Sequence, residues 1–340
     1  MEKKPSYPRS SWIGYPIVIV MLHVIGVAGL AYAASSSAAF WGLGLLAYTY
    51  GLRHAFDADH IAAIDNTVRK LTEQKRNPLG VGFYFSLGHS SVVFLLVLGI
   101  ALSIKWIQNE MPLMQDIGGV IGMSVSGLFL ILIGLLNLAI LIQLLRMFRQ
   151  MRVEKLDTEQ LNHLLESRGL FARLFRPLFR FIGRSWHVYP LGFLFGLGFD
   201  TATEIGLLAV SATAAQASVP LAGILSLPIL FAAGMSLMDT ADGFLMSKAY
   251  DWAFMTPLRK MYYNITVTAI SVAAALVIGV VELIQVAADK LNLQSPFFRW
   301  ISDIDFSMMG YVLVGLFILA WIVSILVWKK MKLEQRFMNV

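Results

Sequence analysis

The chain has 340 residues, of which 57% are hydrophobic and only 14% are charged. With a mean hydropathy of +0.69, it is too apolar for an ordinary water-soluble domain, and the composition indicates a membrane protein. The sequence contains no cysteine, which excludes disulfides and thiolate metal ligands together.

Eight mostly apolar stretches follow one another along the chain. They cover residues 13–34, 40–66, 81–104, 118–145, 187–213, 220–247, 262–287 and 307–328. Each is long enough to cross a hydrocarbon layer of roughly 30 Å as an α-helix. The sequence therefore predicts an all-α integral membrane protein with eight transmembrane helices, numbered below as the first to eighth predicted spans.

Basic residues predict the orientation of these spans, because short loops rich in Lys and Arg stay on the cytoplasmic side. They gather before the first span and after the second, fourth, sixth and eighth, with nine of them in residues 146–184. The connections 35–39 and 214–219 carry no charge. Both termini are therefore predicted to be cytoplasmic, in a multi-pass protein of the plasma (inner) membrane. This bias accounts for the net charge of +6, so the lipid bilayer is the expected partner and nucleic acid is not.

One long polar segment, residues 149–186, divides the chain into a first membrane half, 1–148, and a second, 187–340. We interpret the segment as a cytoplasmic connection. Within it, residues 170–182 place apolar side chains on one half of a helical wheel and arginines opposite them. This pattern predicts an amphipathic helix lying on the anionic inner leaflet.

Two short segments of the first half recur in the second. Phe56-Asp57 resembles Phe199-Asp200, 143 residues further on, and Gly88-His89-Ser90 resembles Gly234-Met235-Ser236, 146 residues further on. In the predicted topology the second and fifth spans run in opposite directions. The sequence therefore suggests an inverted repeat that relates spans one to three to spans four to six, as in many secondary transporters.

The second predicted span holds the densest group of ionisable residues. Six of them lie within thirteen positions: Arg53, His54, Asp57, Asp59, His60 and Asp65. Each charge at the middle of a membrane costs about 2.5 to 3.5 kcal/mol, so such a group indicates function. On an ideal helix His54, Asp57 and His60 share one face, at about 0°, −60° and −120°. Asp59 lies about 100° off that face; it could orient a histidine, pair with Arg53, or bind a ligand if the helix is locally unwound.

Other spans carry side chains that could complete a site. These are His89 in the third span, Asp200 and Glu204 in the fifth, and Asp239 and Asp242 in the sixth. The spacings of four and three place each acidic pair on one helix face. Hydrogen bonding between helices is the alternative role for these pairs.

Imidazole and carboxylate ligands without thiolate suit borderline divalent ions such as Ni²⁺, Co²⁺ and Zn²⁺. The alternative is a buried ion network that only packs helices together, but packing seldom needs two histidines and three carboxylates in one span. His23 in the first span and Asn137 in the fourth are single polar residues on apolar helices. Such residues commonly bond a neighbouring helix, so they are weaker candidates.

Four segments closely resemble the signatures of the nickel/cobalt transporter (NiCoT) family. They are RHAFDADHIAAIDNTVRK in the second span, LGHSSVV in the third, LGFDTATEIGLL in the fifth and GMSLMDTADG in the sixth. The His-x4-Asp-His core of the first signature is intact as His54, Asp59 and His60. The resemblance implies eight spans and high-affinity uptake of Ni²⁺, Co²⁺ or both across the plasma membrane.

The resemblance also implies roles for individual residues. It assigns metal recognition and passage to His54, Asp57, Asp59 and His60, with support from His89, Asp200, Glu204, Asp239 and Asp242. It further suggests that His23 influences the preference between the two metals.

A secondary permease is the predicted mechanism, because the chain has no Gly-x4-Gly-Lys-Ser/Thr segment for ATP. Neither an ATPase partner nor a cofactor is expected, and the metal ion is the transported substrate. Two rivals stay open: a divalent metal efflux permease with the same ligands, and an intramembrane metalloenzyme. The enzyme is disfavoured because six histidines, one of them in the connection and one at a helix mouth, are too few for a histidine-rich iron site.

Overall fold

The computed structural model describes residues 10–35, 37–102, 105–153, 182–198, 202–216, 219–253, 257–304 and 309–331. Over these ranges the chain forms helices joined by turns and no β-strand, which confirms the all-α prediction. The first half contains α1 (Ser10–Ala34), α2 (Ala39–His54), α3 (Ala58–Glu73), α4 (Val81–Ala101) and α5 (Lys105–Val153). The second contains η1 (Ser185–Val188), α9 (Tyr189–Phe195), α10 (Ala202–Gln216), α11 (Leu221–Ala253), α12 (Pro257–Lys290), α13 (Pro296–Ser302) and α14 (Met309–Met331).

Several of these helices are suited to a membrane. Among the described residues, five are long and apolar enough to cross one: Ile13–Ala34, Val81–Ala101, Ile117–Ala139, Leu221–Asp251 and Ile265–Lys290. Gly206–Ala215 and Met309–Ser324 are shorter apolar helices. Six of the predicted spans each overlap one described helix, the second overlaps α2 and α3, and the fifth overlaps the end of η1, α9 and α10. The class of a helical membrane protein is thus supported, while the count of eight and the orientation stay predictions.

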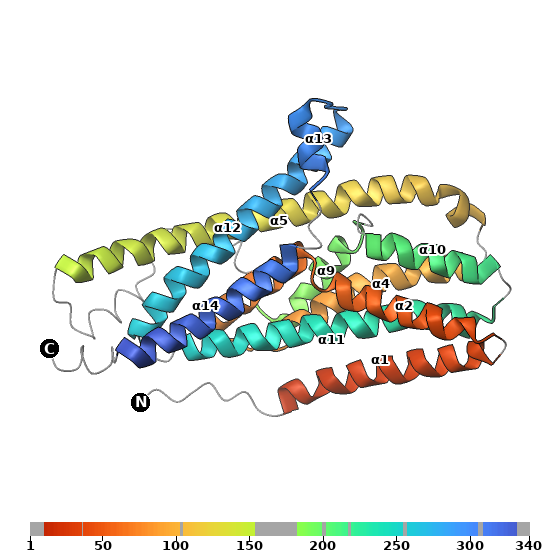
Figure 1. Ribbon diagram of the computed structural model, residues 1–340, viewed down its shortest axis with the longest axis horizontal. Coiled ribbons are helices and arrows are strands. Elements are labelled where there is room, and N and C mark those ends of the chain that lie inside the picture. Colours follow the sequence, from red (N-terminus) through yellow and green to blue (C-terminus); the bar gives the residue numbers. More distant parts are fainter. Residues whose placement is uncertain are drawn as a thin grey trace.

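Large apolar side chains lie on the outside of the bundle as well as inside it. On α1, Ile17 is 53% exposed and Val24 is 62% exposed, and on α14 Leu319 is 56% exposed. α1 packs along α11, at the lower edge of the bundle in Figure 1. An apolar exterior of this kind is expected where lipid, and not water, surrounds the helices.

Two of the predicted spans are not continuous helices. The ideal helix used to place His54, Asp57 and His60 is interrupted, and local unwinding was the alternative that the sequence left open. α2 ends at His54 and α3 begins at Ala58, with Asp57 in an extended conformation (φ −64°, ψ 142°) at the start of α3. In the fifth span, α9 ends at Phe195 and α10 begins at Ala202. α9 is a short helix near the middle of the bundle (Figure 1).

The break after α2 is held by a helix from the other end of the chain. Gly310 of α14 lies so close that a β-carbon there would overlap the carbonyl oxygen of Phe56. The rings of Phe56 and Tyr311 stack at 4.6 Å between centroids, with 20° between their planes. The non-helical carbonyl of Phe56 is therefore covered by protein, as irregular backbone within a membrane requires.

Two helix crossings next to the breaks, α2 with α11 and α9 with α4, are formed by residues at corresponding positions of the predicted repeat. A β-carbon at Gly51 of α2 would overlap the backbone of Phe231 of α11, and one at Gly192 of α9 would overlap the backbone of Phe85 of α4. Phe85 and Phe231 are 146 residues apart, the same offset that relates Gly88 to Gly234. Both crossings also place the second glycine, Gly234 or Gly88, against the backbone of a tyrosine, Tyr48 or Tyr189. These contacts support the predicted inverted repeat.

The predicted domain boundary at residue 148 lies inside a helix, because α5 continues to Val153. Residues 154–181 lie outside the described ranges, and with them almost all of the predicted amphipathic helix over 170–182. The division into two membrane halves and a cytoplasmic connection therefore stays a prediction.

Candidate metal centre

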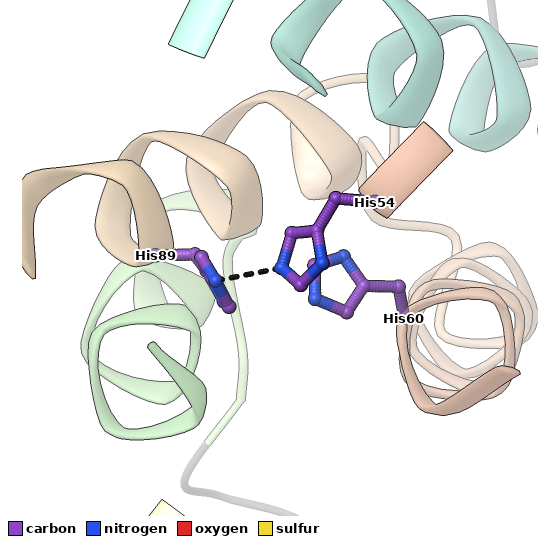
Figure 2. Close-up of side chains that lie close together, drawn as sticks. All are labelled: His54, His60 and His89. Carbon is purple, nitrogen blue, oxygen red and sulfur yellow. Dashed lines mark hydrogen bonds between the residues drawn. The ribbon is translucent and has the colours of Figure 1, made fainter. Parts of the chain in front are cut away.

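Three histidines from separate helices meet inside the bundle. His54 is the last residue of α2, His60 lies in the first turn of α3, and His89 lies in the middle of α4. Each offers a ring nitrogen, and these nitrogens lie within 4.8 Å of one another. None of the three residues is more than 2% exposed. Figure 2 shows the three rings turned toward a common space between the helices.

The closest pair of nitrogens belongs to His54 and His89, whose Nε2 atoms are 2.8 Å apart. Two imidazole nitrogens at this distance can share one proton but cannot both carry one. The other nitrogen of His54, Nδ1, lies 2.8 Å from Oδ2 of Asp57 and 3.2 Å from Oγ1 of Thr203. Asp57 therefore favours a proton on Nδ1, which leaves the Nε2 lone pair of His54 directed into the cluster.

The helix break explains how Asp57 reaches His54. An aspartate at the start of a helix usually accepts a hydrogen bond from the first backbone amides. The side chain of Asp57 makes no such bond and turns toward the imidazole instead. Sequence reasoning placed both residues on one face of a regular helix; they meet because the helix stops between them.

Two carboxylates from the second half of the chain complete the group. Oε1 of Glu204, in α10, lies 2.7 Å from Nε2 of His89 and 3.9 Å from Nε2 of His54. Oδ2 of Asp239, in α11, lies 3.7 Å from Nδ1 of His60. The site thus combines α2, α3 and α4 with α10 and α11.

Asp239 is fully buried, and neither of its oxygens has a hydrogen-bond partner among the described residues. A buried carboxylate without hydrogen bonds is costly unless a cation compensates it. Because His60 is close but not hydrogen-bonded to it, the space between the two side chains is a natural position for a positive ion.

Asp59 occupies a different place from the other residues of its signature. Its Oδ1 accepts a hydrogen bond of 2.9 Å from the backbone amide of His60, and the side chain is only partly buried. A carboxylate in the first turn of a helix stabilises its positive end. The contact favours a supporting role for Asp59, through the backbone at the start of α3.

Several predicted residues have partners elsewhere. Both oxygens of buried Asp65 accept hydrogen bonds of 2.6 Å, one from Tyr250 and one from Ser271, so Asp65 ties α3 to α11 and α12. The amide of Asn137 donates to Asn66. His23 lies 3.2 Å from the hydroxyl of Tyr48, which joins α1 to α2. These contacts match the helix-bonding alternative.

The remaining predicted residues are not brought into the cluster by a described contact with the histidines. Arg53 is exposed on α2. The oxygens of Asp242 are buried and have no hydrogen-bond partner among the described residues. Asp200 lies outside the described ranges.

Sequence reasoning missed the neighbours that shape the cluster. Thr203 contacts Nδ1 of His54, and two phenylalanines flank the imidazoles. Phe85 lies edge-on to His60 with 4.8 Å between ring centroids, and Phe231 lies 5.6 Å from His54. Their equal spacing from Gly88 and Gly234 was the signal that could have identified them.

The donor set is imidazole nitrogen and carboxylate oxygen in a buried position, which suits Ni²⁺, Co²⁺ or Zn²⁺. Binding such an ion would replace the proton shared by His54 and His89. Together with the apolar helices and the two interrupted spans, these features are typical of a membrane transporter for a divalent transition-metal ion.

Comparison with known proteins gives the family. Residues 40–327 match the family NicO, described as high-affinity nickel-transport protein. The chain is 58% identical to the nickel transporter NixA of Staphylococcus aureus, covering 96% of this chain and 97% of that protein. It is 48% identical to the nickel transporter NicT of Mycobacterium tuberculosis, over 94% of this chain and 89% of the relative.

A third relative, the cobalt transport protein NhlF of Rhodococcus rhodochrous, is 42% identical over 89% of this chain and 88% of its own length. No solved structure matches the chain. The chain belongs to the high-affinity nickel-transport family, which confirms the resemblance to nickel/cobalt transporters.

Proposed function

We propose that this protein takes up Ni²⁺, Co²⁺ or both with high affinity across the plasma membrane, as a secondary permease. The observation that carries the proposal is the convergence of His54, His60 and His89 on one buried space beside Glu204 and Asp239. The relatives named as nickel and cobalt transporters support both metals as substrates.

In the proposed mechanism a partly dehydrated ion replaces the proton between His54 and His89. Glu204 and Asp239 then balance its charge, and Asp57 holds the His54 ring in place. The binding group draws on helices from both predicted repeats, and two of its spans are interrupted next to it. Alternating access therefore follows from a small rotation of one repeat against the other around the ion.

The membrane potential can drive the inward movement of the metal ion without ATP. A divalent ion that moves inward through 100 mV gains roughly 4.6 kcal/mol, twice the value for a single charge. That corresponds to a concentration ratio of about 2,000. No ATPase partner is required.

Uptake of radioactive Ni²⁺ by cells that express the full chain tests the function. We expect accumulation inside the cells, and at least a roughly tenfold loss of uptake at low Ni²⁺ for Asp239→Asn, because the amide cannot balance the charge of the ion. Asp289→Asn is the matched control, since the side chain of Asp289 is 68% exposed and lies at the end of α12. Metal that leaves the cells, or equal uptake by Asp239→Asn and Asp289→Asn, would overturn the proposal.

The proposed topology has eight membrane crossings with both termini in the cytoplasm. Reporter fusions after Asn109 and after Gln160 are expected to lie on opposite sides of the membrane, because the fourth span separates them. A phosphatase reporter active only outside and a fluorescent reporter active only inside give the two readouts. Finding both positions on the same side would rule out this topology.

A further inference from the structure

A second site of interest lies at the end of the bundle where α1 begins and α3 ends. A cavity of about 570 Å³ opens there and is lined by Tyr15, Arg76, Asn77, Tyr84, Gly183, Arg184, Ser185 and Trp186. Its volume is within the range of about 300 to 1,000 Å³ typical of ligand pockets. It is built from α1, the turn after α3, α4 and the segment before α9, and it takes no part in the metal centre.

The charge of this cavity is one-sided. Among the described residues that line it are two arginines and no acidic side chain. Outside the lining, burial and the positive charge of Arg76 lower the pKa of Lys70 to about 8. Two planar guanidinium groups in one cavity match a phosphate, which they can bind through several parallel hydrogen bonds.

The framework of the cavity is fixed by contacts between segments distant in sequence. Nη1 of Arg76 donates a hydrogen bond of 2.5 Å to the carbonyl of Gly183. Oγ of Ser185 donates one of 2.7 Å to the carbonyl of Asn77. These two hydrogen bonds connect the segment that contains Arg76 to the segment that contains Arg184, so the two arginines do not lie on independent loops.

Its aromatic wall resembles the interfacial belt of membrane proteins. The ring of Tyr15 packs on Phe83 at 5.1 Å and edge-on to Tyr84 at 5.8 Å, and Trp186 is 52% exposed. Tyrosine and tryptophan favour the level of the lipid headgroups. Directly after Tyr15, α1 exposes aliphatic side chains such as Ile17, on which acyl chains can lie.

We infer that this cavity binds the phosphate headgroup of an anionic phospholipid of the cytoplasmic leaflet. Basic pockets between helices on the cytoplasmic side are suited to such headgroups. A free phosphate would satisfy the arginines equally, but it would leave the aromatic wall and the adjoining apolar surface of α1 unused. The bound lipid would join the start of α1 to the connection before α9.

Native mass spectrometry of the full chain in detergent tests this inference, with phosphatidylglycerol, phosphatidylcholine and inorganic phosphate as separate probes. We expect phosphatidylglycerol to be retained at least roughly tenfold better than phosphatidylcholine, and Arg76→Gln/Arg184→Gln to remove that preference. The control Arg146→Gln/Lys248→Gln removes two exposed basic side chains from elsewhere on the predicted cytoplasmic side and is expected to keep it.

Arg76→Lys/Arg184→Lys keeps both charges and allows the test to proceed if the glutamine variant does not fold; its lipid retention should fall as salt increases. Equal retention of the two lipids would overturn the inference, as would the same loss in the control variant. Inorganic phosphate that binds the cavity and displaces phosphatidylglycerol would assign the site to a soluble anion instead. Because none of these readouts involves metal, their outcome is independent of the transport proposal.

Discussion

His54→Ala is expected to abolish Ni²⁺ uptake and to lower the affinity of the purified protein for Ni²⁺ by more than about 100-fold. The substitution removes an imidazole whose two nitrogens are both engaged, Nε2 with His89 at 2.8 Å and Nδ1 with Asp57 at 2.8 Å. It also leaves the Asp57 carboxylate, which is 3% exposed, without that partner. Equilibrium Ni²⁺ binding and cellular uptake measure the two effects separately.

His187→Ala is the control for a lost imidazole. His187 lies in η1, where its Nδ1 accepts a hydrogen bond of 3.2 Å from the amide of Gly183. It belongs to no part of the metal cluster, so Ni²⁺ binding should stay unchanged. If the His54 variant folds and still binds Ni²⁺ as well as the His187 variant, the histidine cluster is not the binding site.

The local pattern of the sequence was sufficient to select most of the residues that the structure brings together in the candidate site. Two histidines and three aspartates within one apolar stretch raise the free energy of membrane insertion, so their presence indicates function. Because the sequence has no cysteine, the side-chain donors had to be nitrogen and oxygen. His89, Glu204 and Asp239 were identifiable for the same reason, each as an ionisable residue in an otherwise apolar span. The fold brings these three side chains together, and their spacing in the sequence does not predict how close they lie.

The sequence did not predict where the second span is interrupted. Ala55-Phe56-Asp57 contains neither glycine nor proline, so no local rule ends a helix there. The break is held by Gly310 and Tyr311 of α14, more than two hundred residues further along. Asp65 shows the same limit, because no local pattern predicts its hydrogen bonds to Tyr250 and Ser271, which tie α3 to α11 and α12.

The crossings of α2 with α11 and of α9 with α4 connect the predicted repeat to the candidate metal centre. His54 follows Gly51 by one helical turn, and His89 directly follows Gly88. The distance between the histidines therefore depends on how closely these helix backbones approach. Small residues allow that approach in a membrane, where apolar burial alone gives no driving force between helices.

Gly51→Ala and Gly192→Ala are therefore expected to destabilise the protein, each by about 1 to 3 kcal/mol, because the new methyl group overlaps the backbone of Phe231 or Phe85. The melting temperature of the purified protein should fall by roughly 5 °C, at about 2 to 4 °C for each kcal/mol.

Gly42→Ala in α2 is the matched control. It has no atom within 4 Å of its added carbon, so removing a flexible glycine from the helix should leave stability unchanged or raise it by about 0.5 to 1 kcal/mol. Ni²⁺ affinity should fall with stability at positions 51 and 192 and stay constant at 42, since separating the helices also separates the imidazoles. If alanine at 51 and 192 were tolerated as well as at 42, close backbone contact would not be what sets the geometry of the histidines.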